Sequence, residues 1–318
     1  MRGDRVCTTA IVAASLVAVT SGSARRVTAQ EPAPLFRAVV DVVTIDAFAH
    51  RDGQPLTGLV AADFIVRDNG REQRIDAIGT TDSAHVIIGL DLSGSVDGDA
   101  LQQLRNAVRA VTGQLTARDR LSLFTFGDRL RVLARAAVPD IRLDHAIEQM
   151  TATGSTTLHD AVVLGSVLAR TDPRPAAFLL FTDGEDTSSW TTVTRAIAVL
   201  QRTDVVVYPV GAGLATTTTA PSTNLYFQHP SWVAPTPGDS LRMLQMLADT
   251  TGGEFLRVRR DARIADTFAA ILARYRQRHV LSFTPTGVGS RGWHRLDVRL
   301  RNRPGTVVAR EGYMARNP

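Results

Sequence analysis

Lysine is absent from this chain of 318 residues, and all 36 of its basic side chains are arginines. The formal net charge is +5, but the arginines are interleaved with acids, as in LRVRRDAR and RLDVRLRNR. Aromatic side chains do not accompany them in a stripe. A nucleic-acid-binding surface needs clustered basic charge, so this distribution argues against nucleic acid as a partner.

Cysteine is almost as scarce, with Cys7 as its single occurrence. A basic start and the apolar stretch TTAIVAASLVAVTS surround it, and VTA before Gln30 offers small residues for cleavage. This pattern predicts an export signal over residues 1–29, with Ala24 as a second cleavage point. The mature chain then has no disulfide, which is typical of a bacterial periplasmic or extracellular protein. No later stretch is long and apolar enough for an integral membrane segment.

Two regions are rich in β patterns. Residues 36–80 contain VVDVVTIDAFA, the turn RDGQP, and DFIVRDNGREQRI, which reads as two strands around an Asn-Gly turn. The tail, residues 280–315, returns to this patterning. We expect the two regions to pack together as one small β domain.

Between them, residues 84–279 alternate short apolar runs with segments of helical spacing. HVIIGLD, AAFLLFT and DVVVYPVGAG are apolar throughout, as expected of strands buried on both faces. The alternation predicts an α/β fold, an open and mostly parallel sheet flanked by helices. One long segment, Leu214 to Asp239, is rich in threonine and proline, and we expect it to be disordered with a contact role.

Oxygen-bearing side chains follow two of the predicted strands. Asp91, Ser93 and Ser95 come after HVIIGL, and Asp183 comes after AAFLLFT. The loop GSTT between them adds a threonine. Because the carboxyl ends of parallel strands meet at one edge of a sheet, we expect these groups to converge there. An oxygen-only set suits a small, hard divalent cation.

Together these three loops resemble the metal-ion-dependent adhesion site of the von Willebrand factor A family. DLSGS matches its D-x-S-x-S motif, GSTT its threonine loop and FTDGED its T-D-G loop. The resemblance covers about residues 84–279. It implies that Ser93 and Ser95 ligate the metal directly and that Thr156 is the loop ligand, with Thr157 as the competing assignment. Asp91 and Asp183 would act mostly through water or as hydrogen-bond acceptors behind the direct ligands.

The resemblance also implies a cofactor and a partner. The ion would be Mg²⁺, with Mn²⁺ or Ca²⁺ as alternatives, and a Glu or Asp of a partner protein would complete its coordination. The flanking segments, among them GQPLTGLVAADFIVRDNGREQRI and GYMA, are similar to a group of exported proteins abundant in Acidobacteria. A metal-dependent protein-binding module is therefore expected, and a structural or assembly scaffold of the cell envelope is the alternative.

Other readings of the same residues fit less well. An EF-hand calcium loop starting at Asp91 would need a Glu at its twelfth position, where the chain has Gln102. An aspartyl nucleophile would need a second acid where the chain has Ser93. GxSxG, HExxH and glycine-rich phosphate loops are missing, and the seven histidines show no ligand spacing. We therefore predict no catalytic residues.

Overall fold

A six-stranded sheet forms the centre of the α/β region in the computed structural model of this chain, which describes residues 42–94, 96, 98–152, 154–212, 237–258 and 264–315. Five of its strands are parallel, and β8 pairs antiparallel to β7 at one edge. The strands, in their order across the sheet, are β11 (Leu256–Val258), β10 (Val206–Ala212), β9 (Ala176–Thr182), β6 (His85–Asp91), β7 (Arg120–Phe126) and β8 (Arg131–Ala137).

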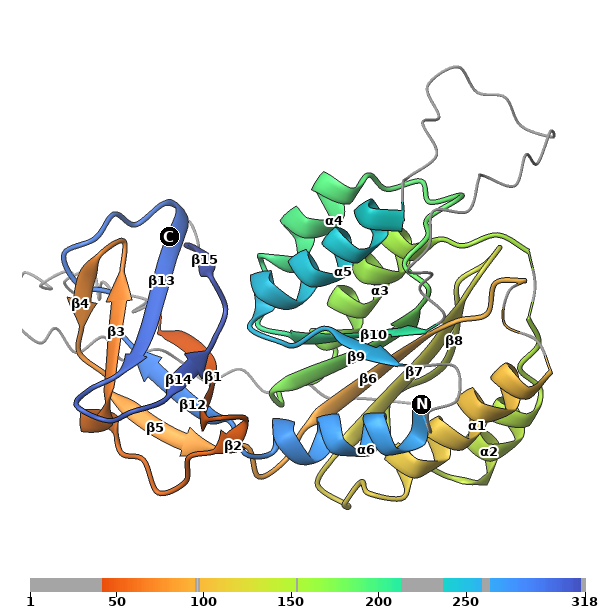
Figure 1. Cartoon of the computed structure of the whole chain (residues 1–318), viewed down its shortest axis with the longest axis horizontal. Coiled ribbons are helices and arrows are strands. Elements are labelled where there is room, and N and C mark those ends of the chain that lie inside the picture. The colour runs from red at the N-terminus through yellow and green to blue at the C-terminus, as the bar shows by residue number, and fades with distance from the viewer. Residues whose placement is uncertain are drawn as a thin grey trace, which may run out of the picture. The chain divides into compact units, whose positions relative to one another are not determined.

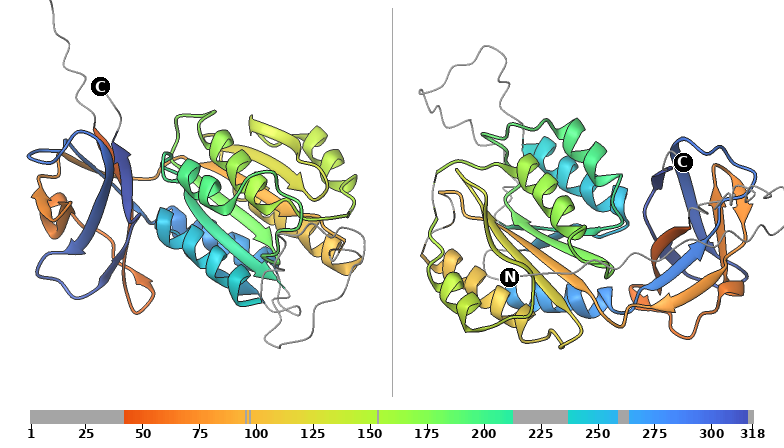
Figure 2. Two further views of the ribbon diagram at one scale, coloured as in Figure 1. Left: turned by 90° about the horizontal axis from the view of Figure 1, so that it is seen from above. Right: turned by 180° about the vertical axis from the view of Figure 1, so that it is seen from behind.

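Helices cover both faces of this sheet, as Figure 1 and Figure 2 show. One face carries α1 (Asp99–Thr112), α2 (Ile141–Glu148) and α6 (Ile264–Tyr275). The other carries α3 (Leu158–Ala169), α4 (Val193–Leu200) and α5 (Pro237–Thr251). The predicted open α/β sheet with flanking helices is confirmed.

The central strand β6 explains why its sequence is apolar throughout. Its alternate side chains enter two different cores, Val86 and Ile88 on the α1 side and Ile87 on the α3 side. Gly89 is needed because a Cβ there would lie 2.7 Å from Cζ of Phe124. Both faces of the strand are therefore fully packed, which fixes the position of Asp91 at its end.

The two β-rich ends of the chain pair with each other in two further sheets. In the first, β1 pairs with β12, and in the second β3 pairs with β13, so each sheet joins strands from both ends. The first consists of β14 (Thr306–Val308), β1 (Val43–Arg51), β12 (His279–Phe283) and β5 (Ala77–Thr80), with β2 (Gln54–Pro55) beside β1. The second consists of β15 (Gly312–Ala315), β13 (Gly292–Leu300), β3 (Phe64–Asp68) and β4 (Arg71–Gln73), and the short 3₁₀ helix η1 (Ala61–Asp63) precedes β3.

Local turn chemistry produces both N-terminal hairpins. Asn69 and Gly70 join β3 to β4, and Asp52 and Gly53 join β1 to β2, all with positive φ. Two consecutive positive φ values define the tight turn that matches the twist of paired strands. A shared core, which includes Ile45, Phe64 and Leu281, unites the two ends of the chain.

One helix, α2, has no counterpart among the elements that we expected from the sequence. It is only eight residues long, and its start is fixed by Asp140, whose carboxylate accepts hydrogen bonds from the amides of Arg142 and Leu143. It buries Leu143 and Ile147. The predicted signal over residues 1–29, Ser95 and nearly all of the segment from Leu214 to Asp239 lie outside the described residues.

Candidate metal site at the carboxyl edge

Three neighbouring strands end side by side at one edge of the central sheet. β6 ends at Asp91, β9 at Thr182 and β7 at Phe126, and β6 lies between the other two. We call these strand ends and the loops that follow them the carboxyl edge. In open α/β sheets this edge is where ligands bind.

Asp91 is fully buried at the centre of this edge. Its Oδ1 accepts a hydrogen bond from the Ser93 amide at 2.9 Å, and its Oδ2 accepts one from the Thr182 hydroxyl at 2.8 Å. Burial and the negative charge of Asp183 raise the pKa of Asp91 to about 7. No basic side chain is among the groups that shift this pKa. Neutral donors therefore hold the carboxylate in place, and within the described part of the chain no basic side chain acts on its pKa.

Backbone hydrogen bonds tie the three predicted loops together. The Gly94 amide donates to the Gly154 carbonyl at 3.1 Å, which joins the first loop to the threonine loop. The Thr156 carbonyl accepts from the amides of Thr187 and Ser188, both at 3.0 Å, which joins the threonine loop to the loop after β9. The hydrogen bond from the Thr182 hydroxyl to Asp91 joins the loop after β9 to the first loop. Each loop is thus fixed against both others.

The two candidate threonines differ in how their hydroxyls are used. The Thr157 hydroxyl is buried and donates to the Gly127 carbonyl at 3.0 Å. The hydrogen bonds of Thr156 within the described part of the chain run through its backbone, since Thr187 Oγ1 accepts from its amide at 2.8 Å. The Thr156 side chain is therefore the one that stays available to a ligand.

Four of the five predicted metal ligands, Asp91, Ser93, Thr156 and Asp183, lie on these linked loops, and the fifth, Ser95, falls in a gap of the described chain. Asp183 follows β9 and is half-buried, and its Oδ1 accepts from the Glu185 amide at 3.1 Å. Its charge acts on Asp91, as the raised pKa shows. Asp91, Ser93 and Asp183 lie at the ends of neighbouring strands or just after them, whereas Thr156 lies in the loop between α2 and α3.

Two further residues at the edge were missed by sequence reasoning. Thr182 orients Asp91, as described above. Asp128 lies two residues after β7, and its Oδ1 accepts from the amide and the hydroxyl of Ser155, at 2.7 and 3.1 Å. A Cβ at Gly154, whose φ is +61°, would lie 1.6 Å from this oxygen. The same rule that selected Asp91 and Asp183, an acid just after a buried strand, also selects Asp128.

The donor chemistry of the edge suits a hard cation that binds hydroxyls as well as carboxylates. Among the residues that the structure describes, no three His, Cys, Asp or Glu side chains cluster so that they could hold a metal ion. A site here would therefore depend on Ser93 and Thr156 beside Asp91 and Asp183. Oxygen-only sets of this kind fit Mg²⁺ and its relatives, and a cation would balance the uncompensated charge of Asp91.

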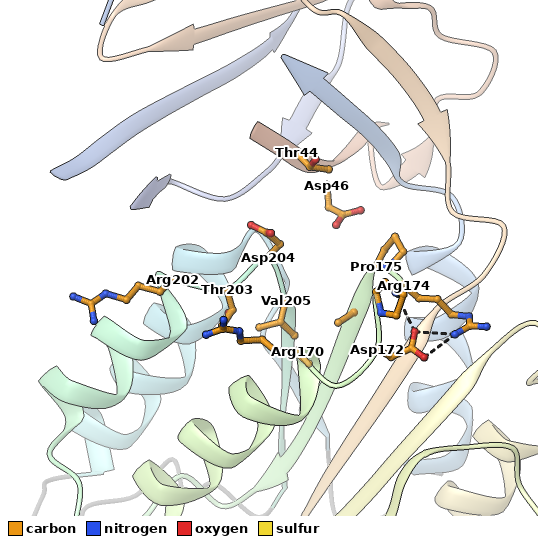
Figure 3. A pocket seen from close by; sticks show the side chains of 13 residues that line it. Thr44, Asp46, Arg170, Asp172, Arg174, Pro175, Arg202, Thr203, Asp204 and Val205 are labelled. Carbon is orange, nitrogen blue, oxygen red and sulfur yellow. Dashed lines mark hydrogen bonds and ion pairs between the residues drawn. The ribbon is translucent and has the colours of Figure 1, made fainter. Parts of the chain in front are cut away.

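A second hollow, of about 290 Å³, lies away from this edge. Figure 3 shows Thr44 and Asp46 of β1 on one side and, on the other, Asp204 and the ion pair of Asp172 with Arg174. Asp46 is buried, and no donor among the described residues reaches its Oδ1. Burial raises its pKa to about 6, although the nearby Arg278 acts to lower it. This carboxylate thus has a resident cation close by.

Residues 85–225 match the family model of the von Willebrand factor type A domain, and the α/β fold of this region is consistent with that match. The name of the matching family specifies no catalytic activity. An uncharacterized protein of Synechocystis sp., sll0103, is 31% identical over 101 residues, which are 30% of this chain and 24% of that protein. The matched part of the chain thus spans about a quarter of that relative.

Several solved structures are similar in fold. A von Willebrand factor type A protein from Catenulispora acidiphila is 14% identical with a TM-score of 0.49, covering 80% of this chain and 75% of the other. BatB from Bacteroides thetaiotaomicron is 17% identical with a TM-score of 0.46, covering 60% of this chain and 98% of the other. Proximal thread matrix protein 1 from the mussel byssus, solved with a zinc-occupied MIDAS motif, is 15% identical with a TM-score of 0.46, covering 65% and 49%. Such likeness concerns the fold alone.

Proposed function

We propose that this chain is an exported, metal-dependent protein-binding module. A divalent cation, Mg²⁺ or else Mn²⁺ or Ca²⁺, is held by Asp91, Ser93, Ser95, Thr156 and Asp183. An acidic residue of a partner protein completes its coordination. The observation that carries the proposal is the buried Asp91 carboxylate, which neutral donors fix beside Asp183 with no basic group acting on it.

The reason for a partner's carboxylate is the charge balance of the ligand set. Serine and threonine hydroxyls are neutral, and Asp91 and Asp183 act mostly through water, so the direct ligands leave most of the ion's charge available to an anionic oxygen from outside. The cation thereby supplies an electrostatic docking point, and the chain's own residues hold it in place. Catalysis is not part of the proposal. A scaffold role without metal binding is the alternative, and metal dependence separates the two.

Export rests on the sequence. The basic start, the short apolar stretch and the small residues before Gln30 support removal of residues 1–29 and release to the periplasm or the exterior. None of the helices in the described ranges is long and apolar enough to cross a membrane.

Calorimetric titration of Mg²⁺ and Mn²⁺ into residues 30–318 tests the proposal. We expect saturable binding by the parent chain and its loss in Asp91→Asn and Thr156→Val. Thr157→Val is the matched control, because it removes a hydroxyl that is already bonded to the Gly127 carbonyl. It should bind metal normally while losing roughly 1 kcal/mol of stability.

Each alternative has its own result. Metal binding that survives in Thr156→Val but is lost in the folded Thr157→Val variant would move the ligand role to Thr157. Absence of metal binding by the parent, together with binding of acidic partner peptides that EDTA does not weaken, would favour the scaffold reading.

A further inference from the structure

Trp190 is the most exposed large hydrophobic side chain in the described part of the chain. Its exposed fraction is 95%, and the next in rank, Ile141, reaches 67%. An indole in water forgoes the largest apolar burial available to any side chain, and tryptophan is the residue type most often found at the centre of binding surfaces. Trp190 is therefore a candidate for a contact with a partner.

The backbone that carries Trp190 is fixed. Its amide donates to Asp160 Oδ2 and the Thr191 amide donates to Asp160 Oδ1, both at 2.9 Å. Asp160 lies in the first turn of α3. In addition, the His159 amide donates to the Ser189 hydroxyl at 3.0 Å. The loop before α4 is thus fastened to the start of α3, and the indole stands on a rigid support.

This support is continuous with the carboxyl edge. Thr187 and Ser188, just before Trp190, donate their amides to the carbonyl of Thr156. The segments 156–160 and 187–191 therefore run side by side, from the candidate metal ligand to the base of the indole. Trp190 is therefore carried by a loop whose backbone is bonded to that of the candidate ligand Thr156.

The flanks of the edge differ in charge. The loop from Asp183 to Thr192 contains three acids and no basic residue. Asp186 lies 3.3 Å from His159, whereas Glu185 is exposed and forms no ion pair with any described residue. On the other flank, Arg129 and Arg131 line a cavity of about 300 Å³ next to the strand end of β7. The loop from Asp183 to Thr192, which carries the indole, is therefore the acidic flank, and it is the one that attracts a cation.

We propose that Trp190 selects partners in which an arginine or lysine lies close to the acidic residue that reaches the metal ion. The basic side chain would lie on the indole face, where tryptophan gives the strongest cation–π contact of the aromatic side chains. The charge of Glu185 adds to the attraction. This inference rests on the proposed function, because the partner's acid must first be held by the ion.

The test uses a displayed library of peptides with a fixed glutamate between four random positions on each side. Residues 30–318 are immobilised in Mn²⁺, and bound peptides are released with EDTA. The parent, Trp190→Ala and the matched control Val167→Ala are compared, since Val167 is an exposed apolar side chain (53%) in the later part of α3. We expect Arg or Lys to be enriched on one flank for the parent and the control, and not for Trp190→Ala.

The best peptide should bind Trp190→Ala roughly 3- to 30-fold more weakly than the parent. Calorimetry with Mn²⁺ alone should give the same ion affinity for all three chains, which shows that the site is intact. EDTA-released peptides with no basic preference, or with the same preference in Trp190→Ala, overturn this inference and leave the proposed function standing. No EDTA-released peptides from the parent overturn both.

Discussion

Two buried aspartates border the α/β region, and they differ in what surrounds their charge. Asp91 accepts hydrogen bonds from Ser93 and Thr182 and has no basic group among those that shift its pKa. No donor among the described residues reaches Oδ1 of Asp46, yet Arg278 acts on its pKa. Burial raises both pKa values, to about 7 and about 6. A raised pKa alone therefore does not distinguish the two carboxylates; the proposal of a metal site at Asp91 depends on its neutral donors and on the absence of a basic group among those that shift its pKa.

The position of Arg278 explains the difference. Its Nη2 donates to the backbone carbonyl of Asp46 at 2.8 Å, and its Nη1 lies 3.4 Å from the hydroxyl of Tyr208. The guanidinium is almost fully buried. It connects β1 to the central sheet and places a fixed positive charge next to Asp46. A second cation would be repelled there, while at Asp91 it would be attracted.

The largest expected effect is on the stabilisation that a metal ion gives to the folded chain, which should be lost in Asp91→Asn and kept in Asp46→Asn. Asp91→Asn and Asp46→Asn make the same chemical change at two buried positions. At an Mg²⁺ or Mn²⁺ concentration about 1,000 times Kd, a ligand that binds only the folded state adds about 4 kcal/mol to the free energy of unfolding. We expect this gain in the parent and in Asp46→Asn, and none in Asp91→Asn. Urea unfolding with and without the ion measures it.

An equal gain in all three chains would show that the ion binds elsewhere. A gain lost in both variants would mean that Asp46 also supports the ion, and the contrast between the two carboxylates would then be wrong.

The contrast also shows what the sequence could and could not predict. The places of Asp91, Ser93 and Asp183 were predictable because these residues lie at or just after the ends of short apolar strands, and parallel topology brings those strand ends together. Asp128 follows the same rule and was overlooked, while α2 is too short for its periodicity to stand out. The environment of Asp46 could not be predicted from the sequence. Its surroundings depend on Arg278, which lies 232 residues away in the chain and meets it only after β1 and β12 pair.

A smaller effect is expected in the pH dependence of stability, measured without metal. The pKa of Asp46 is about 6 in the folded chain, against 3.8 ordinarily. Between these values the folded state keeps a proton that the unfolded state has released, so stability falls as pH rises from about 4 to 6. The slope is at most about 1.4 kcal/mol per pH unit, or about 3 kcal/mol in total. Asp46→Asn removes this contribution.

Other groups titrate in the same window, so the two curves must be subtracted. Burial lowers the pKa values of His85 and His279, which makes stability rise with pH towards 6.5, and the raised pKa of Asp91 acts in the opposite direction. All three residues are present in both chains, and their contributions cancel in the difference. If the difference in stability between the parent and Asp46→Asn stays constant from pH 4 to 6, the pKa of Asp46 is not raised in the folded chain.

The smallest expected effect concerns Asp128, which supports the carboxyl edge from outside the predicted ligand set. Its carboxylate holds the Ser155 amide and hydroxyl, next to Gly154 and one residue before Thr156. Groups that orient metal ligands typically change affinity by about 10-fold or more when removed. We expect Asp128→Ala to weaken Mn²⁺ binding about 10-fold and to lower stability by about 1 kcal/mol. Ser155→Ala keeps the amide bond to Asp128 but removes the hydroxyl, which bonds Asp128 and accepts from the Ser188 hydroxyl at 2.8 Å. It should have a weaker effect on affinity. Equal affinities in the parent and Asp128→Ala, measured by calorimetry, would mean that the threonine loop holds its place through Gly94, Thr187 and Ser188 alone.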